Sequence, residues 1–365
     1  MRAIVLRADH DEGRVAMEEI AEPSAEDGDL LVQAVALGIC GTDRNLVRRP
    51  RSLKPDTNWL VLGHESLGRV LEAPEASGFH PGQLVVGTVR RPDPMPCFFC
   101  ESGEPDACEN DRWAERGISG RDGFGSERYR LEVDCAVHVD PGLGLAGVLV
   151  EPTSIVAKAW EKLDRLVGLR RSRALVLGAG PIGLLAALLS VQRGYEVHVV
   201  DQMSYGLKPD QARALGAIYH SSTDGLAGGF DAVMECTGVL TGEALRLAGE
   251  SGAVCFVAGR EVGAGTLPLG RNGVVTSTIS SNRRHFVAAH EALRRADPAW
   301  LAGLLVPSIP LDQWQLGFRH PPPDGIKAVI RFDTVGNSRG STRLRSPAIG
   351  KVRSDKPATS GVNRT

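Results

Sequence analysis

The sequence predicts an α/β protein in which a β-rich part precedes a parallel sheet covered by helices. Two observations carry this prediction. The first 140 residues consist of short β-like segments broken by glycine and proline. From Arg173 onward, strand-like and helix-like segments alternate, as a parallel sheet requires. The chain has 365 residues, of which 42% are hydrophobic, so it can bury a sizeable core and its length predicts two domains.

The β-rich part is expected to form a small barrel, because its apolar segments are short and bounded by turn residues. The expected strands are MRAIVLR (1–7), LLVQAVALGIC (30–40), SLGRVLEA (66–73), GQLVVGTV (82–89) and SERYRLEV (126–133). A helix entered through a proline is expected over 144–163.

The second part is expected to alternate strand and helix up to a final strand near the C-terminus. The expected elements are RALVLGAG (173–180), a helix from Ile182, YEVHVVD (195–201), a helix over 209–215, FDAVMECTG (230–238), AVCFVAG (253–259), the helical HFVAAHEALRRA (285–296) and GIKAVIRFD (325–333). The polar residues after 335 show no periodicity, so this tail is predicted to be disordered.

Charge and cysteine usage exclude several classes of protein. The formal net charge of −2 gives no basic field for nucleic acid or an anionic membrane. The longest apolar run, 174–191, is interrupted by GAGPIG and is therefore interpreted as strand, turn and helix rather than a membrane span. The charged N-terminus does not resemble a signal peptide, so the seven cysteines are expected to be reduced in a cytoplasmic protein.

A dinucleotide site is predicted at the start of the alternating part. Gly178, Gly180 and Gly183 form a G-x-G-x-x-G turn between the strand ALVL and an apolar helix, with Pro181 and Ile182 between the last two glycines. Such a turn lets backbone amides and the helix N-terminus hold a pyrophosphate, which predicts a Rossmann domain. Asp201 closes the next strand, where its carboxylate would bind ribose hydroxyls and repel a 2′-phosphate. NAD is therefore favoured over NADP.

Thiol, imidazole and carboxylate candidates for a metal are scattered along the chain. They are Cys40 and Asp43 in GICGTD (which also carries the hydroxyl of Thr42), His64 and Glu65 in LGHE, and Glu151 in VEPTS. These are the ligand types of a catalytic zinc that keeps an open position, and such a zinc polarises an alcohol oxygen during hydride transfer to a nicotinamide. Each residue alone also has an ordinary structural interpretation, as a core thiol, a core histidine or a helix-end charge, and spacing does not join them.

Together, GICGTD, LGHE, the EP before a helix and GAGPIG resemble the zinc-dependent medium-chain dehydrogenase/reductase superfamily over nearly all of residues 1–333. The narrower likeness is to its glucose 1-dehydrogenase group, through VRRP, ERGI followed by DGF, VEPTS, NRRHF and IKAVIRF. The resemblance implies a GroES-like catalytic domain formed by 1–165 and 306–335, a Rossmann domain at 166–305 and a tail at 336–365. It also implies a dimer or tetramer that acts in carbohydrate metabolism.

The resemblance assigns roles to individual residues. Cys40, His64 and Glu65 would bind the catalytic zinc with Glu151 as a fourth or exchanging ligand, and Thr42 would bind the substrate oxygen and pass its proton outward. Glu115 and Asn282 match positions that contact sugar hydroxyls, and Thr237 would lie on the nicotinamide side. The implied reaction transfers hydride from a sugar hydroxyl to NAD(P), oxidising an aldose to its lactone.

Two departures keep other substrates open. Asn272 stands where some members of the group carry a sugar-contacting histidine. The pair Arg90-Arg91 is interpreted either as a solvated surface feature or as a selector of anionic substrates. The alternatives are therefore a polyol, cyclitol or amino-alcohol dehydrogenase with the same chemistry and, more distantly, a non-catalytic NAD-binding protein.

The remaining cysteines and histidines divide into a metal lobe and structural positions. Cys97, Cys100 and Cys108 match the last three of the four cysteines in the superfamily's structural zinc lobe, whose first position here is Pro94. A carboxylate could replace the missing ligand, from Asp93, Asp106 or Asp111, and a metal-free lobe is the alternative. Core positions are expected for the other thiols, Cys135, Cys236 and Cys255. Surface or boundary positions are expected for His285 and His290.

Overall fold

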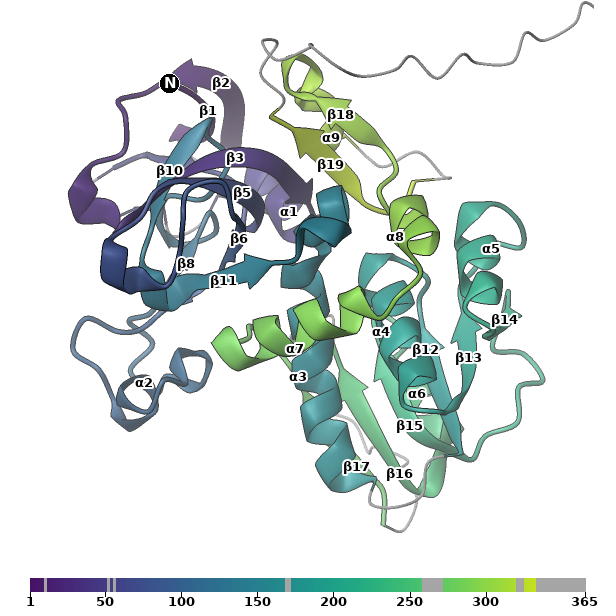
Figure 1. Ribbon diagram of the computed structural model, residues 1–365. Helices are drawn as coiled ribbons and strands as arrows, with labels where there is room; N and C mark the ends of the chain where they lie inside the picture. The colour runs from purple at the N-terminus through teal and green to yellow at the C-terminus, as the bar shows by residue number, and fades with distance from the viewer. Residues whose placement is uncertain are drawn as a thin grey trace, which may run out of the picture. The chain divides into compact units, whose positions relative to one another are not determined.

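The structure is a computed structural model that describes residues 1–332 except 10–11, 51–52, 55–56, 168–171, 258–271 and 320–324. The predicted disordered tail, 336–365, therefore lies outside the described residues. Within the described part, the strands up to β11 gather in one group, and the strands from β12 to β17 form a second sheet flanked by helices (Figure 1). The predicted α/β fold class, with a β-rich domain and a Rossmann sheet, is confirmed.

The β-rich part contains three antiparallel or mixed sheets that include every strand expected there. Three strands pair in the order β2 (Glu12–Glu19), β1 (Arg2–Asp9) and β4 (Trp59–Val61). The main sheet has the order β11 (Ala136–Val139), β6 (Leu84–Gly87), β5 (Glu65–Glu72), β3 (Leu30–Ile39), β19 (Ala328–Arg331) and β18 (Ser308–Pro310), with β10 (Arg128–Leu131) also paired to β3. The third sheet is β7 (Arg90–Arg91), β8 (Ala114–Arg116) and β9 (Gly120–Arg121).

The last strand of the described chain returns to the first part. β19 pairs antiparallel with β3, with Ala328 opposite Ile39 and Ile330 opposite Leu37. Alternate residues of both strands are apolar and buried, so the register places one hydrophobic face of β19 against the core of the barrel. This pairing agrees with a catalytic domain formed by both chain ends, whose boundaries at 165 and 306 stay predictions.

The helices of the first part are short except for one. They are α1 (Gly41–Arg48), α2 (Phe98–Glu101) and α3 (Val150–Leu166), with 3-10 turns η1 (Ala25–Asp27), η2 (Glu75–Ser77), η3 (Pro105–Ala107), η4 (Val133–Cys135) and η5 (Pro141–Leu149). The first six residues of the helix expected over 144–163 lie in the 3-10 turn η5 instead, and the α-helix begins at Val150. Gly144 has φ 50°, which interrupts the helical path within η5. Cys135, expected in a β-like core segment, lies half-buried in η4 instead.

The Rossmann part is a six-stranded parallel sheet. Its order is β14 (Ile218–His220), β13 (Glu196–Val200), β12 (Arg173–Leu177), β15 (Phe230–Glu235), β16 (Ala248–Phe256) and β17 (Val274–Ser277). The remaining helical elements are α4 (Pro181–Gln192), α5 (Leu207–Ala214), α6 (Thr241–Leu247), α7 (Arg283–Arg294), α8 (Pro298–Leu304), η6 (Leu311–Gln313) and α9 (Gln315–Phe318). The central strands are apolar on both faces because helices cover both sides of the sheet.

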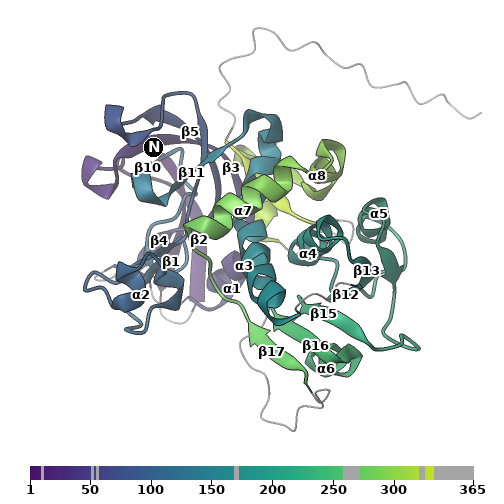
Figure 2. The same cartoon turned by 60° about the horizontal axis from the view of Figure 1, so that its bottom comes forward.

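Helices α3 and α7 pack side by side, as both views show (Figure 2).

Within the described residues, the continuous helical stretch Pro141–Leu166 is long and apolar enough to span a membrane by length and composition. However, 67% of its most apolar window is buried inside the protein, as in the core helix of a globular fold. The run 174–191 forms β12, the glycine turn and α4, as predicted.

Trp160 of α3 provides a test of this packing. Its side chain is fully buried, its ring centroid lies 5.1 Å from that of Tyr195, and the Arg193 guanidinium lies 4.8 Å above it. We expect Trp160→Ala to lower the free energy of unfolding by about 3–5 kcal/mol, because the cavity cannot refill. Urea unfolding followed by circular dichroism measures this. Arg165→Ala on the exposed face of α3 is the control, and an equal loss there would contradict the packing account.

Candidate active site

Three of the predicted zinc ligands meet at the edge of the main barrel sheet. Cys40 caps the N-terminus of α1, and the adjacent His64 and Glu65 lie at the start of β5. One ligand atom from each residue lies within 4.8 Å of the other two, and Cys40 Sγ is 3.2 Å from His64 Nε2. The imidazole and the carboxylate are buried and the thiol is half-buried. Strand pairing between β3 and β5 therefore joins residues that sequence spacing could not.

Asp43 orients this imidazole from its other side. Its Oδ1 lies 3.2 Å from His64 Nδ1, and its Oδ2 accepts a hydrogen bond of 2.8 Å from the Cys40 backbone N–H. Burial alone would lower the pKa of His64, but the Asp43 carboxylate and the Cys40 sulfur raise it well above its usual value. A carboxylate at Nδ1 leaves Nε2 to face a metal, as in carboxylate–histidine–zinc triads. No specific role was assigned to Asp43 from the sequence.

Glu65 is also bound by a lysine that the sequence did not single out. Lys327 Nζ donates to both Glu65 oxygens, at 2.5 and 2.6 Å, and both residues are only 2% exposed. Each charge is thereby compensated inside the protein. Lys327 lies one residue before β19, in a segment that the sequence showed only as a strand. The Glu65 carboxylate must share its oxygens between this ammonium and any metal.

Glu151 and Thr42 border the cluster. Glu151 lies in the first turn of α3, and burial raises the pKa of its carboxyl to about 7, although His64 acts in the opposite direction. Glu151 is not part of the group of three whose ligand atoms lie within 4.8 Å of one another, but His64 and Glu65 both influence its carboxyl electrostatically. Thr42 is exposed at the start of α1 and its backbone N–H donates to Cys40 Sγ at 3.2 Å. Thiolate, imidazole and carboxylate together fit a zinc ion.

The first predicted sugar-contacting residue, Glu115, is held by Arg90. The two residues face each other across β7 and β8, and Arg90 Nε and Nη2 lie 3.1 and 3.0 Å from Glu115 Oε1. The guanidinium also stacks on Trp113 at 3.5 Å. Only Glu115 Oε1 accepts these bonds, so Oε2 is the oxygen that a hydroxyl could bind.

The arginine pair is neither solvated nor unpaired, which corrects both interpretations made from the sequence. Arg90 and Arg91 are buried, and Arg91 forms a two-point ion pair with Glu132 at 3.1 and 2.9 Å. Because each guanidinium faces a carboxylate, the pair offers an anionic substrate no unpaired charge. Asn272 is exposed in the turn before β17.

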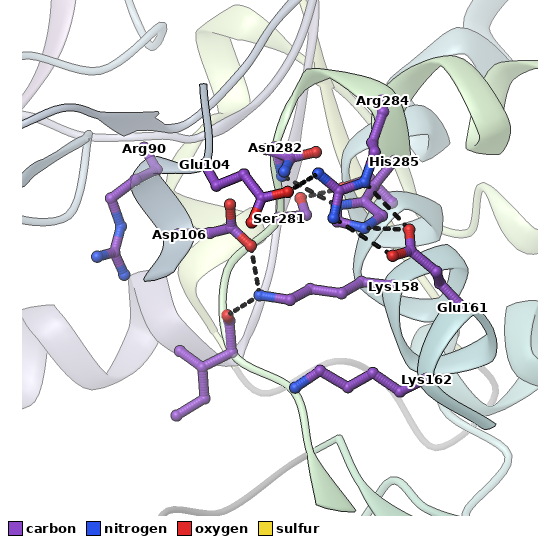
Figure 3. A network of polar contacts seen from close by, with 12 residues as sticks. Arg90, Glu104, Asp106, Lys158, Glu161, Lys162, Ser281, Asn282, Arg284 and His285 are labelled. Carbon is purple, nitrogen blue, oxygen red and sulfur yellow. Dashed lines mark hydrogen bonds and ion pairs between the residues drawn. The ribbon is translucent and has the colours of Figure 1, made fainter. Parts of the chain in front are cut away.

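The second predicted sugar-contacting residue, Asn282, lies at the N-cap of α7 beside a polar network (Figure 3). Its side chain is 4% exposed, and neither its Oδ1 nor its Nδ2 has a hydrogen-bond partner among the described residues. Its backbone N–H donates to His285 Nδ1 at 3.1 Å, so the ring proton lies on Nε2, which donates to Glu161 Oε2 at 3.0 Å. A buried amide without a partner is suited to bind a ligand hydroxyl.

The expectation that His285 and His290 are surface or boundary residues is wrong, because both are buried. His285 is 2% exposed, because the Asn282 backbone and Glu161 enclose its ring. Burial lowers the pKa of His285, and the nearby Arg284 lowers it further. His290 is 9% exposed, and its Nε2 accepts from the Asp140 backbone N–H at 2.9 Å.

The predicted dinucleotide turn has the required backbone. Gly178 has φ 101°, and a Cβ on Gly183 would lie 1.8 Å from Gly178 O, so both positions require glycine. A Cβ on Gly180 would meet no atom within 4 Å, which leaves open space above the N-terminus of α4 for a phosphate. Asp201 directly follows β13, and its Oδ2 accepts from the Ala179 backbone N–H at 2.8 Å.

The loop after β15 lies against this turn. A Cβ on Gly178 would lie 2.8 Å from Thr237 Cγ2, so the two loops are in close approach. The buried Glu235 carboxylate shapes the loop by accepting from the backbone N–H groups of Thr237 and Gly238, each at 2.8 Å. Glu235 carries no signal in the sequence beyond the end of a strand. Together, the glycine turn, Asp201 and the loop that carries Thr237 are suited to hold a dinucleotide cofactor.

The lobe brings its three cysteines together. One sulfur from each of Cys97, Cys100 and Cys108 lies within 4.8 Å of the other two. Backbone N–H groups of Glu109 and Cys100 lower the pKa of Cys97 to about 7, which favours a thiolate. A lobe zinc stays a prediction. None of the three candidate carboxylates, Asp93, Asp106 and Asp111, joins this group in the described residues. For Asp93 and Asp106, other contacts explain why.

Those two carboxylates are bound elsewhere. Asp93 Oδ1 accepts from the Met95 N–H at 2.8 Å, and its Oδ2 accepts from Asn110 and Arg112. Asp106 pairs with Lys158 at 2.7 Å. As the lobe stands in the described residues, neither Asp93 nor Asp106 is free to serve as the fourth ligand of a metal held by these cysteines.

Comparison with known proteins supports the resemblance. The family model described as "Glucose dehydrogenase C-terminus" matches residues 144–332, and the "Alcohol dehydrogenase GroES-like domain" matches residues 26–141. Glucose 1-dehydrogenase of Methanocella arvoryzae is 36% identical over 79% of this chain and 86% of its own length. Glucose 1-dehydrogenase of Halobacterium salinarum is 32% identical over 86% of this chain and 94% of its own length.

The solved structures agree. Glucose dehydrogenase of Haloferax mediterranei, in complex with NADP, Zn and gluconolactone, is 26% identical with a TM-score of 0.81, and the match covers 92% of this chain and all of that one. The family match spans more than half of the chain, and the sequence similarity extends through both parts of the fold. The chain therefore belongs to the glucose dehydrogenase family of the zinc-dependent medium-chain dehydrogenases and reductases.

Proposed function

We propose that the chain is a zinc-dependent glucose 1-dehydrogenase that oxidises the C1 hydroxyl of an aldose to the lactone and reduces a nicotinamide dinucleotide. The observation that carries this proposal is the buried cluster of Cys40, His64 and Glu65 in a chain similar along most of its length to glucose 1-dehydrogenases. The enzyme is proposed to be cytoplasmic, to act in carbohydrate metabolism and to form a dimer or tetramer.

Each predicted ligand has a stated part in this proposal. Cys40 and His64 would hold the zinc with an oxygen of Glu65 or Glu151, and Asp43, which lies at His64 Nδ1, would keep Nε2 available as the ligand atom. When bound, zinc polarises the sugar hydroxyl and the nicotinamide takes up hydride. Thr42, exposed beside Cys40, accepts the hydroxyl proton and passes it to solvent.

The sugar and the cofactor are positioned by residues from both parts of the fold. Glu115 Oε2 and the unpaired Asn282 amide bind hydroxyls of the sugar. Gly178, Gly180 and Gly183 hold the pyrophosphate, Thr237 lies near the nicotinamide, and Asp201 binds the adenosine ribose. Pro181 and Ile182 form the first turn of the helix whose N-terminus faces the phosphates.

A substrate panel tests the proposed function. NADH absorbance is followed with aldoses, polyols and inositols, and we expect turnover with glucose-type aldoses. Cys40→Ala should lower kcat/KM by at least ~10²-fold, because losing a ligand costs more than losing a partner of one. Activity on inositols or polyols with none on aldoses would contradict the aldose assignment.

Cys97→Ala is the matched control for the loss of a thiol. This variant should lose no more than the lobe metal, counted by mass spectrometry of native protein, and should keep its kcat. If Cys40→Ala retained the wild-type rate, the zinc mechanism would be wrong.

Asp201 allows a test of the cofactor preference. We expect a higher kcat/KM with NAD than with NADP, because the carboxylate repels a 2′-phosphate. Asp201→Asn keeps an acceptor for Ala179 N–H and should lower the NAD/NADP ratio about tenfold through the KM for NADP. Lys208, whose Nζ lies 3.7 Å from Asp201 Oδ2, would then attract the phosphate, so adding Lys208→Met should reverse part of the gain. An unchanged ratio in Asp201→Asn would contradict this role.

A further inference from the structure

Helix α3 and the segment that joins β17 to α7 are connected by a row of hydrogen bonds. Ser154, Lys158 and Lys162 follow one another at intervals of four residues on α3. Their partners are the Ser281 hydroxyl at 2.7 Å, the Ile279 carbonyl at 3.2 Å and the Ser277 carbonyl at 2.7 Å. We call these three contacts the α3 ladder. Figure 3 shows Lys158 and Lys162 extending from α3 on the same side as Ser281.

The spacing of the ladder follows from backbone geometry. Four helical residues advance by about 6 Å, and two residues of an extended chain advance by about 6.6 Å. Lys158 and Lys162, one turn apart on α3, can therefore meet Ile279 and Ser277 without loss of register where the segment is extended, whereas the left-handed Ser280 interrupts that path before Ser281. Ser154 also donates to Glu151 O at 2.6 Å, so Ser281 is the donor in the uppermost contact.

The segment depends on these contacts. Thr278 N–H donates to Phe256 O at 2.9 Å, and in the described part of the chain no further sheet hydrogen bond holds residues 279–281. Ile279 is 50% exposed, and Ser280 has φ 58°, a left-handed conformation that a serine adopts only where its surroundings impose it. The α3 ladder supplies that constraint.

The segment ends at Asn282, whose amide is buried without a partner. An unpaired buried amide destabilises the protein unless a ligand completes its hydrogen bonds. Its exact place therefore determines how well a sugar hydroxyl is bound, and the nearest ladder contact, at Ser281, is one residue away. A shift of the segment would move this amide relative to Glu151, which lies on α3, the helix that the ladder joins to the segment.

The lobe is attached to the same ladder. Lys158 Nζ also lies 2.7 Å from Asp106 Oδ2, two residues before Cys108, and both side chains are largely buried. Arg284 of α7 pairs with Glu104 of the lobe at 2.8 Å and with Glu161 of α3 at 3.1 Å (Figure 3). The lobe, α3 and the start of α7 are thus held together around Asn282.

We propose that Lys158, Lys162 and Ser281 are positioning residues that set the place of the Asn282 amide, and thereby the affinity for the sugar. This inference rests on the proposed function for the identity of the ligand. Lys158 and Lys162 contact the segment, and Ser281 belongs to it. None of the three is proposed to contact the reacting atoms. Their effect should therefore appear in the KM for the sugar, and it should increase from Lys162 to Lys158 to Ser281 as the contact approaches Asn282.

The test removes the contacts one at a time. Ser281→Ala and Lys162→Met each delete one contact, and Lys158→Met is combined with Asp106→Asn so that no unpaired charge remains. We expect each variant to raise the KM for glucose between twofold and about tenfold, with kcat nearly unchanged, since one hydrogen bond contributes about 0.5–1.5 kcal/mol. Lys158→Arg should retain most of the affinity, and Arg213→Met on the exposed surface of α5, which also removes a positive charge, should change nothing.

A double-mutant cycle separates positioning from a general structural role. In an Asn282→Ala background, the ladder variants should raise the KM no further, because their effect passes through that amide. An equal further rise in that background, or an unchanged KM with a lowered melting temperature, would overturn the proposal.

Hydrogen exchange gives a readout that does not need activity. Amides of residues 278–283 should exchange faster in the ladder variants than in the wild type, and unchanged exchange would also overturn the proposal. A wild-type enzyme that oxidises no aldose would contradict the proposed function alone, and the exchange result would still decide whether the ladder holds the segment.

Discussion

The buried ion pair between Glu65 and Lys327 is the constraint on which the arrangement of the site depends. Removing two charges from water costs several kcal/mol for each ion, and this cost is offset only when the geometry is close and both charges remain paired. Lys327 Nζ meets both oxygens of Glu65, and the two residues are 262 positions apart. The chain can satisfy this requirement only if β19 returns beside β3, which places Lys327 across β3 from Glu65 and the adjacent His64 at the start of β5.

The positions of the other site residues follow from this arrangement of β3, β5 and β19. His64 has Asp43 on one ring nitrogen and Cys40 on the other, so its orientation is set before any metal arrives. Glu151 approaches the cluster from α3, and the same helix holds Ser281 and the segment before Asn282 through the α3 ladder. A single helix thus connects the proposed metal site with the proposed sugar contact. Packing of Trp160 against the Rossmann part holds that helix in place.

The parts of this arrangement that local sequence patterns encode were predictable. The dinucleotide turn was, because one contiguous segment carries its glycines, its strand and its helix. Cys40, His64 and Glu151 were joined only by resemblance, since strands distant in sequence bring them together. Lys327 was not predictable, because its partner Glu65 lies 262 positions away in the sequence. The lysines of the α3 ladder were not predictable, because a lysine that donates to a backbone carbonyl has no counterpart residue to recognise. His285 was misjudged because helical periodicity does not reveal that a ring accepts the N-cap amide.

Anomalous X-ray diffraction at the zinc edge, on crystals of the enzyme purified without chelators, tests the central claim most directly. The account predicts a peak about 2.0–2.3 Å from His64 Nε2 and Cys40 Sγ, with a carboxylate oxygen of Glu151 or Glu65 completing the protein ligands. A second peak among Cys97, Cys100 and Cys108 would show that the lobe also holds metal. No peak beside Cys40 and His64 in an enzyme that oxidises glucose would contradict the account.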